Sequence, residues 1–185
     1  LEDHELGGNE TRGADGPLKV SMPTLKDKLS AAQIAAGQAL GWTVKTDVNA
    51  PDDAVSIGYA PRTIHKGKRQ SAATAFLRPA EKRANLTVLT ERTVNRVVFE
   101  AKRAVGVEIL HDGATEVLRA RREVIVCGGA MASPGILERS GVGDAQRLSK
   151  LGIPVVHDNP EVGEGLLEHR GVIVREACRH PAEHP

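Results

Sequence analysis

Two-thirds of the way along a chain of 185 residues, positions 123–130 read Glu123-Val124-Ile125-Val126-Cys127-Gly128-Gly129-Ala130. Within the segment 123–127, residues 124–127 are continuously apolar rather than alternating, which is typical of a strand buried on both faces of a sheet. After the glycines, Ser133-Pro134 offers a helix N-cap and a proline suited to the first helical position. The order of strand, glycines and helix predicts an α/β fold with some α+β character.

The glycine turn is also the best candidate site that the residues themselves indicate. In open α/β sheets, ligands bind beyond the carboxyl ends of the strands. Glycine lets a backbone approach a ligand closely, and a helix N-terminus favours an anion or a polar ligand edge. We therefore expect Cys127, Gly128 and Gly129 to border a ligand. An equally supported alternative is that the glycines only allow the helix and the strand to pack closely.

Working outward from this turn, the spacing of apolar residues predicts two helices nearer the N-terminus. The longer covers residues 25–40, with Thr24 as its N-cap and Gly41 as its stop. The shorter covers residues 71–77, where the serine caps the first turn and Pro79 ends the helix. A third short helix is expected after the glycine turn, over residues 145–151.

Alternating apolar residues predict strands between these helices. Three of them, joined by short turns such as His111-Asp112-Gly113, form an antiparallel meander over residues 93–100, 105–109 and 117–120. Shorter extended segments are expected at residues 18–20, 86–89 and 153–156. Residues 1–16 are rich in turn formers and are expected to be irregular. The basic run 65–69 contains a turn glycine and is interpreted as a solvated turn.

Composition narrows the classes of function. The chain is 40% hydrophobic and 26% charged, which is an ordinary globular profile. Aromatic residues make up 2% and the formal net charge is +1, which argues against a nucleic-acid-binding surface. No apolar run approaches the length of a membrane helix. Because Cys127 lies in an apolar run, we expect a buried, unreactive thiol. With two cysteines, a reducing, cytoplasmic setting is the default.

Motifs that would carry chemistry by themselves are not found in the sequence. It has no GxGxxG after a strand, no phosphate-binding loop, no HExxH and no GxSxG. The seven histidines are scattered, and a surface position is the commoner reading for each. Three acidic residues near Gly163 could pair as acids, but a solvated turn fits their spacing better; they are Glu161, Glu164 and Glu168.

Beyond the glycine turn, the sequence resembles a known family. Residues 129–143 (GAMASPGILERSGVG) match the second signature of the glucose-methanol-choline (GMC) oxidoreductases. Residues 69–80 (RQSAATAFLRPA) are similar to another family segment, and weaker likenesses follow in order at 85–90, 104–108, 152–156 and 162–166. The resemblance covers roughly residues 12–169 and is strongest to the choline or alcohol dehydrogenase branch.

The resemblance implies a division of the chain and a cofactor. Residues 17–84 are expected to be part of the substrate-binding domain and residues 85–169 part of the FAD-binding domain, followed by a polar tail at 170–185. In relatives, a backbone position matching Val94 contacts the adenine of FAD. The positions matching Cys127, Gly128 and Gly129 approach the adenosine part.

Departures from the family pattern limit what can be carried over. The family's NLxDH box reads Gly165-Leu166-Leu167-Glu168-His169 here, so its polar contacts are changed. The pyrophosphate-binding GxGxxG and the active-site histidine of relatives have no match in these 185 residues. We therefore expect an internal piece of an enzyme with no catalytic residue of its own, and the opening at Leu1 rather than methionine agrees with that.

The function that the resemblance implies is oxidation of the CH–OH group of an alcohol, by hydride transfer to flavin. One alternative is a free-standing, non-catalytic module derived from the same fold. Another is a different flavoprotein with two dinucleotide-binding motifs, which would lack the long signature. Choline, a simple primary alcohol and a polyol all stay open as substrates, as do oxygen and another electron acceptor. The oligomeric state is equally open.

Overall fold

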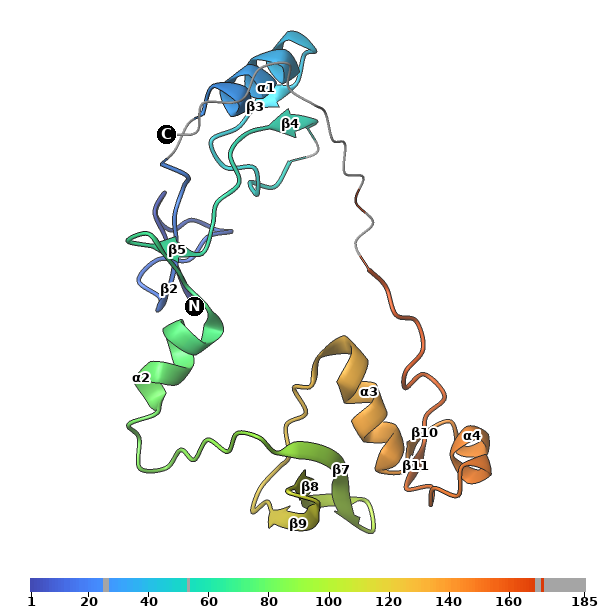
Figure 1. The fold of residues 1–185 in the computed structure, drawn as a ribbon. Coiled ribbons are helices and arrows are strands. Elements are labelled where there is room, and N and C mark those ends of the chain that lie inside the picture. Colours follow the sequence, from blue (N-terminus) through green and yellow to red (C-terminus); the bar gives the residue numbers. More distant parts are fainter. Residues whose placement is uncertain (25–26, 53, 169–170, 172–185) are drawn as a thin grey trace. The chain divides into compact units, whose positions relative to one another are not determined.

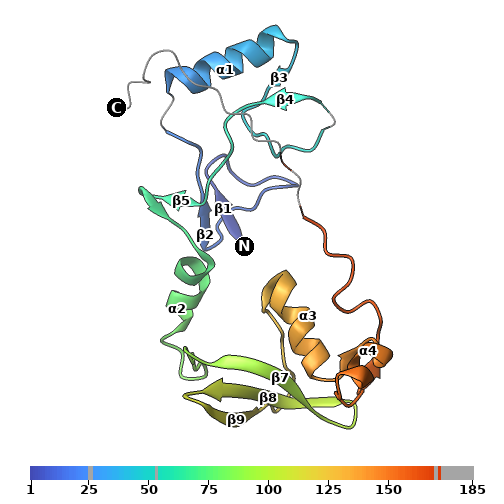
Figure 2. The same ribbon diagram turned by 45° about the vertical axis from the view of Figure 1, so that its right-hand side comes forward.

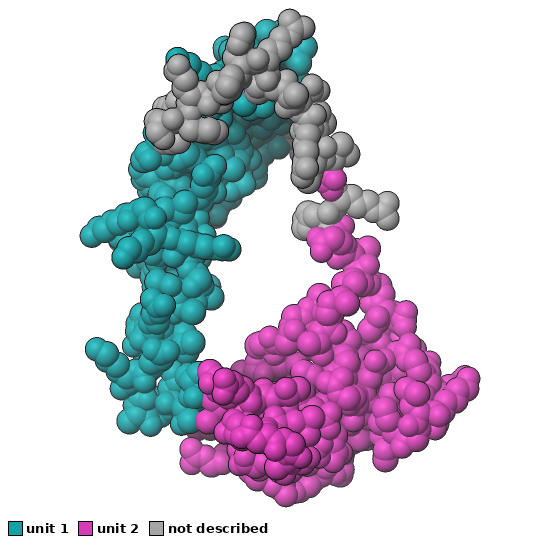
Figure 3. Space-filling view, viewed as in Figure 1, with its two compact units in different colours: residues 1–88, 174–185 teal, residues 89–173 magenta. Residues whose placement is uncertain are grey.

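The computed structural model describes residues 1–24, 27–52, 54–168 and 171 of the chain. It divides into two compact units, and the boundary lies between Val88 and Leu89. Figure 3 colours the unit that contains residues 1–88 teal and the unit that begins at Leu89 magenta. Each unit has its own secondary structure.

The first unit is made of short elements along the blue-to-green part of the ribbon (Figure 1). Two of its strand pairs are parallel and one is an antiparallel hairpin. The pairs are β1 (Glu2–His4) with β2 (Leu18–Val20), β3 (Thr43–Val44) with β4 (Ser56–Ile57), and β5 (Ile64–His65) with β6 (Lys68–Arg69). Its helices are α1 (Lys28–Ala39), the π-helical turn Ala73–Leu77 and α2 (Arg78–Ala80).

Strand β1 corrects the expectation of irregular structure over residues 1–16. Its residues show no apolar alternation, so nothing in the sequence indicates a strand there. Polar contacts hold it instead. Asp3 forms an ion pair with Lys19 of β2, and the Glu2 carboxylate accepts a hydrogen bond from the Gly13 backbone at 2.9 Å.

Helix α1 begins three residues later than expected, at Lys28. Asp27 is its N-cap, and its carboxylate accepts bonds from the Ser30 N–H at 2.8 Å and the Ser30 hydroxyl at 2.6 Å. The prediction of Thr24 as the N-cap is wrong. The Asp27 carboxylate, three residues further on, accepts the hydrogen bond from a free amide of the first turn instead. Gly41, at φ +85°, follows the helix end as predicted.

The apolar face of α1 is mostly exposed in the first unit. Leu29 is 47% exposed and Leu40 is 72% exposed. The helix meets the β3–β4 pair through Gly37, the buried residue of α1, where an added Cβ would lie 3.0 Å from Ile57. The predicted period is therefore present in the helix, but it does not line a core.

Pro79 lies inside a helical segment rather than after it, so the predicted stop there is wrong. A proline has no N–H to donate to the preceding turn. The chain accommodates this by widening the turn before it: the Arg78 N–H donates to the Ala73 carbonyl, five residues back. Such π-turns insert one residue without breaking the helix, and the segment therefore continues through α2.

The second unit contains the predicted antiparallel meander (Figure 2). Strand β8 (Arg103–His111) lies between β7 (Thr93–Glu100) and β9 (Ala114–Arg119). The β8–β9 turn places Asp112 at φ 48° and Gly113 at φ 77°, as two-residue hairpin turns demand. Val97 and Ile109 are buried, with 4% and 2% of their surface exposed, so the core of this unit begins on the meander.

The rest of the second unit is built on two helices and a short parallel strand pair. These elements are α3 (Gly129–Arg139), α4 (Ala145–Lys150), β10 (Val142–Gly143) and β11 (His157–Asp158). The helix predicted over 145–151 is confirmed, with Asp144 as its cap. The extended segment predicted at 153–156 is displaced, since the strand begins at His157.

Helix α3 begins at Gly129, four residues before the predicted start at Ser133-Pro134, so that prediction is wrong. Pro134 lies inside the helix, where it has no N–H to donate to the carbonyl four residues earlier and its ring crowds that carbonyl. Gly128 is the N-cap and contributes no side-chain bond. The helix therefore starts directly at the glycine turn, and the local capping signal Ser133-Pro134 lies inside it.

Two predicted strands are not formed. Residues 86–89 and 123–127 have no regular structure, and Ile125 is 74% exposed. A strand buried on both faces needs a neighbour on each edge. Among the described residues no strand pairs with either segment, and β9 pairs with β8 alone. Without partners, backbone N–H and C=O groups gain nothing from the extended form.

Candidate functional site

The two glycines before α3 differ in their surroundings. A Cβ added to Gly128 would lie 3.2 Å from both the Ala132 Cβ and the Ser133 nitrogen, tighter than an ordinary contact. At Gly129 an added Cβ would meet nothing within 4 Å, and φ is +79°, a region that favours glycine. Close packing therefore explains Gly128, whereas Gly129 has an open backbone face.

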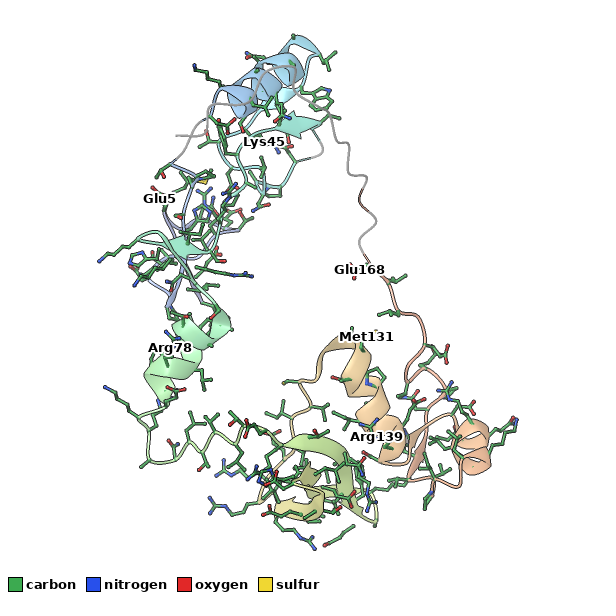
Figure 4. All side chains as sticks on the ribbon, in the orientation of Figure 1. Glu5, Lys45, Arg78, Met131, Arg139 and Glu168 are labelled. Carbon is green, nitrogen blue, oxygen red and sulfur yellow. The ribbon has the colours of Figure 1, made fainter. Side chains whose placement is uncertain are left out.

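The start of α3 adds hydrogen-bond donors to this open face. The first backbone N–H groups of a helix have no partner within the helix, and no side chain caps them here. They carry the positive end of the helix dipole. Figure 4 labels Met131 in this first turn, and its side chain is 79% exposed. The region can thus offer backbone donors to a polar or anionic ligand edge.

Cys127 is exposed and free, so the prediction of a buried thiol is wrong. The prediction depended on a strand at 123–127 buried between neighbours, and that strand is not formed. The thiol therefore lies at the accessible end of an extended segment, directly before Gly128. Cys178 lies outside the described residues.

Val94 lies on β7, half-buried, and pairs in register with Ile109 of β8. The register shifts directly after it, so that Asn95 is an extra residue in the strand. Within the described residues, no hydrogen bond or ion pair joins Val94 to the Cys127–Gly129 turn. The four predicted site residues thus share one unit, in two separate places.

Helix α3 and strand β7 are held together by residues that the sequence analysis did not single out. The Arg139 Nε donates to the Asn95 carbonyl at 2.7 Å, and the Ser140 hydroxyl accepts the Val97 N–H at 2.7 Å. Figure 4 labels Arg139 at the end of α3 that lies near the meander. Both residues belong to the long signature segment, which is the one signal that could have indicated them.

The acidic residues near Gly163 are not arranged as a pair of acids. Glu164 accepts a hydrogen bond from Arg147 at 2.9 Å, and Glu161 is exposed. The solvated-turn interpretation suits Glu161. Glu164 belongs to an ion-pair cluster with Arg147 at its centre.

One cavity of about 610 Å³ lies in the first unit, beside β2 and β5. Its wall includes the Asp3–Lys19 ion pair, Arg62 and His65. His65, in the basic run interpreted as a solvated turn, lines this cavity. Within the described ranges, no group of three or more His, Cys, Asp or Glu residues could hold a metal ion, and no helix is long and apolar enough to cross a membrane.

Comparison with known proteins assigns the chain to a family. The GMC oxidoreductase family model matches residues 5–170. The chain therefore belongs to the GMC oxidoreductases, whose cofactor is FAD. Mitochondrial choline dehydrogenase of Homo sapiens is 44% identical over 180 residues, which are 97% of this chain and 30% of that protein. Oxygen-dependent choline dehydrogenase of Chromohalobacter salexigens is 41% identical over 97% of this chain and 32% of that protein.

Solved structures agree with the family assignment. Pyridoxine 4-oxidase from Mesorbium loti matches with a TM-score of 0.77 and 32% identity, over 87% of this chain and 32% of that one. An FAD-dependent oxidoreductase from Chaetomium thermophilum matches with a TM-score of 0.77 and 26% identity, over 83% and 27%. The mixed α/β fold of the family is thereby confirmed for a chain that spans about a third of its curated relatives.

The likeness reaches further than the residues 12–169 that the motifs indicated. The human relative aligns with 180 of the 185 residues, so the alignment continues into the tail expected to depart from the family. The tail itself, apart from Gly171, lies outside the described residues.

Proposed function

We propose that the chain is part of an FAD-dependent enzyme that oxidises the CH–OH group of a small alcohol, choline-like or a simple primary alcohol. The family match supports this, together with curated relatives named choline dehydrogenase at 41–44% identity. In this proposal, residues 17–84 contribute to the substrate-binding domain and residues 85–169 to the FAD-binding domain. The unit boundary after Val88 lies close to that division and supports it.

Within this proposal, Val94, Cys127, Gly128 and Gly129 contact the adenosine part of FAD. The observation that carries it is the open backbone at Gly129, where no atom stands within 4 Å of an added Cβ. The free amides at the start of α3 suit a polar ligand edge, and exposed Cys127 leaves the approach clear. The residues present therefore fit the group. FAD, when bound, supplies the hydride acceptor.

We propose no catalytic residue among these 185 residues. Two of the described histidines have structural partners: His4 is buried and accepts the Leu6 N–H at 3.2 Å, and His111 contacts Arg92. What the chain's own residues do in this proposal is bind and orient the cofactor. The chain by itself is expected to show no alcohol-dependent reduction of a dye.

The test is a titration of the 185-residue chain with ADP, followed by amide NMR shifts, which detect weak binding. Shift changes are expected at Val94 and at 127–129, and riboflavin, which lacks the adenosine part, should leave them unmoved. Gly129→Ala should weaken ADP binding about tenfold or more, since an added methyl group fills the open face and costs roughly 1.4 kcal/mol or more.

The matched control is Gly113→Ala. Gly113 has a similar φ of +77° and equally open surroundings, but lies in the β8–β9 turn. Its substitution carries the same backbone strain and should leave ADP binding unchanged. Equal losses in the two variants, or no shift at 127–129 at millimolar ADP, would contradict the site assignment. Dye reduction by the chain alone would contradict the absence of a catalytic residue.

A cytoplasmic setting is part of the proposal. A free, exposed Cys127 suits a reducing compartment, where thiols are kept reduced. The human relative carries the word mitochondrial in its name. Fractionation of cells that produce the parent enzyme distinguishes the two locations.

A further inference from the structure

Arg147 of α4 lies at the centre of a cluster that joins three parts of the second unit. One guanidinium nitrogen, Nη1, donates to the Glu164 carboxylate at 2.9 Å. The other, Nη2, donates to the Glu138 carboxylate of α3 at 2.5 Å and to the Val162 carbonyl at 3.2 Å. A planar guanidinium suits such divided bonding, because its donors are fixed in a fork.

The loop held by Arg147 rests directly on α3. Gly163, between the two loop residues bonded to Arg147, has φ +85°. An added Cβ there would meet the Pro134 Cβ and the Glu138 Oε1, each at 3.7 Å. The loop therefore turns at its closest approach to the helix. Its next residues form the box Gly165–His169, whose last residue lies outside the described ranges.

We propose that Arg147 is a positioning residue, which holds residues 162–164 on α3 and thereby sets the path of the segment that follows. This inference rests on the proposed function, in which residues 85–169 belong to the FAD-binding domain. Arg147 itself touches neither the cofactor nor a substrate in the proposal. It acts through Glu138 and Glu164.

The charges explain why the loop depends on this one residue. Glu138 and Glu164 both bond to the same guanidinium, so they lie close to each other. Arg147 bonds both, and the two carboxylates hold the pKa of Arg147 above its usual value, Glu164 first through its hydrogen bond. Without the guanidinium, two like charges remain side by side and repel each other. Removing Arg147 therefore reverses the sign of the interaction between loop and helix.

Hydrogen–deuterium exchange of the 185-residue chain tests the proposal. Arg147→Gln should speed exchange of the Val162 and Glu164 amides about fivefold, in line with the strength of partly exposed ion pairs. Exchange in the β7–β8 region should not change. Arg147→Lys should lie between, because an ammonium keeps the charge without the fork.

A double variant separates positioning from general damage. Adding Glu138→Gln to Arg147→Gln removes the repulsion and should return exchange most of the way to the starting rate. Salt at 1 M should have a similar effect on the single variant, since screening then acts within about 3 Å. Lys150→Gln, also on α4 and without an ion pair in the described residues, should change nothing.

Unaltered loop exchange in Arg147→Gln, or equal acceleration in the meander, would overturn the proposal, as would a double variant no slower than the single one. These readouts need no flavin. If they behave as expected while ADP causes no shifts in the chain, the role of Arg147 stands and the proposed FAD contacts are contradicted.

Discussion

Ser140 connects two elements of the second unit through one hydroxyl. Its Oγ accepts the Val97 N–H at 2.7 Å and donates to the Ile136 carbonyl at 2.5 Å. Its exposed fraction is 6%, so no water replaces either partner easily. Val97 is on β7 and Ile136 on α3, and the serine therefore satisfies a strand donor and a helix-end acceptor together.

Ser140→Ala is expected to lower the free energy of unfolding by about 1–3 kcal/mol, because the Val97 N–H is left buried without an acceptor. Urea titration followed by circular dichroism measures the change. Ser149→Ala is the control: Ser149 is exposed on α4, and its loss should stay within about 0.5 kcal/mol. A loss at Ser140 no larger than that at Ser149 would mean that the bond adds nothing.

Glu108 makes the meander sensitive to acid. Its carboxylate accepts bonds from Arg96 at 2.8 Å and Asn95 at 2.6 Å, and these, Arg96 first, hold the pKa of Glu108 below its usual value of 4.5. A lowered pKa in the folded state adds stability that is present above the unfolded pKa and is lost as pH falls through the folded one.

Stability should therefore decline below about pH 4.5, and Glu108→Gln should flatten that decline while lowering stability at pH 7. Denaturant midpoints measured from pH 7 to pH 3, for the parent chain and for Glu108→Gln, give the pH dependence of stability in each. Glu116→Gln, an exposed position on β9 without an ion pair in the described residues, serves as the control and should follow the parent curve. A Glu108 variant with the parent's slope would contradict the assignment.

At the scale of elements, the pairing of β8 with β9 depends on one glycine. Gly106 is opposite Arg119, and a Cβ there would overlap the Leu118 carbonyl oxygen and lie 3.2 Å from the Arg119 Cα. The φ of Gly106 is not in the left-handed region. Glycine is therefore required here because a side chain would not fit, and not because of the backbone conformation. Gly106→Ala is expected to push β9 away and to cost about 1–3 kcal/mol of stability.

Gly135→Ala should have the opposite sign. Gly135 lies inside α3, and its added Cβ would meet the Arg139 Nη1 at 3.2 Å, so this exposed guanidinium, whose Nε bonds the Asn95 carbonyl, has to shift by a few tenths of an ångström. A helical Gly→Ala change stabilises by about 0.5–1 kcal/mol. Thermal unfolding of both variants measures the contrast, and a Gly106 variant as stable as the Gly135 variant would contradict the close approach of the strands.

Over the whole molecule, the elements that could be predicted from the sequence are those whose pairing partners lie close by along the chain. The meander was predicted because its strands pair with their neighbours along the chain and its turns carry Asp112-Gly113. The segments 86–89 and 123–127 were mispredicted because a strand also needs neighbours that its own residues do not encode. The same holds for the apolar face of α1, because the spacing of its apolar residues predicts a face but does not indicate which element packs against it.

Only the position of the candidate site along the chain could be predicted from the sequence. The glycines and the helix after them indicated where a ligand can approach, but not that Gly128 is packed and Gly129 open. The Arg147 cluster had no sequence signal, because its residues are nine and seventeen positions apart on separate elements. Contacts between elements at such spacings follow no helical or strand period.

The exposed run at 123–127 has a consequence for the chain as a solute. Three consecutive residues of high β-propensity, Val124-Ile125-Val126, with Ile125 exposed to water, resemble the centre of the short windows from which strands stack between copies. Glu123 supplies one gatekeeper charge on its N-terminal side, and the two glycines interrupt it on the other. Purified chain is therefore best handled dilute, because crowding copies together gives this run the neighbours it lacks.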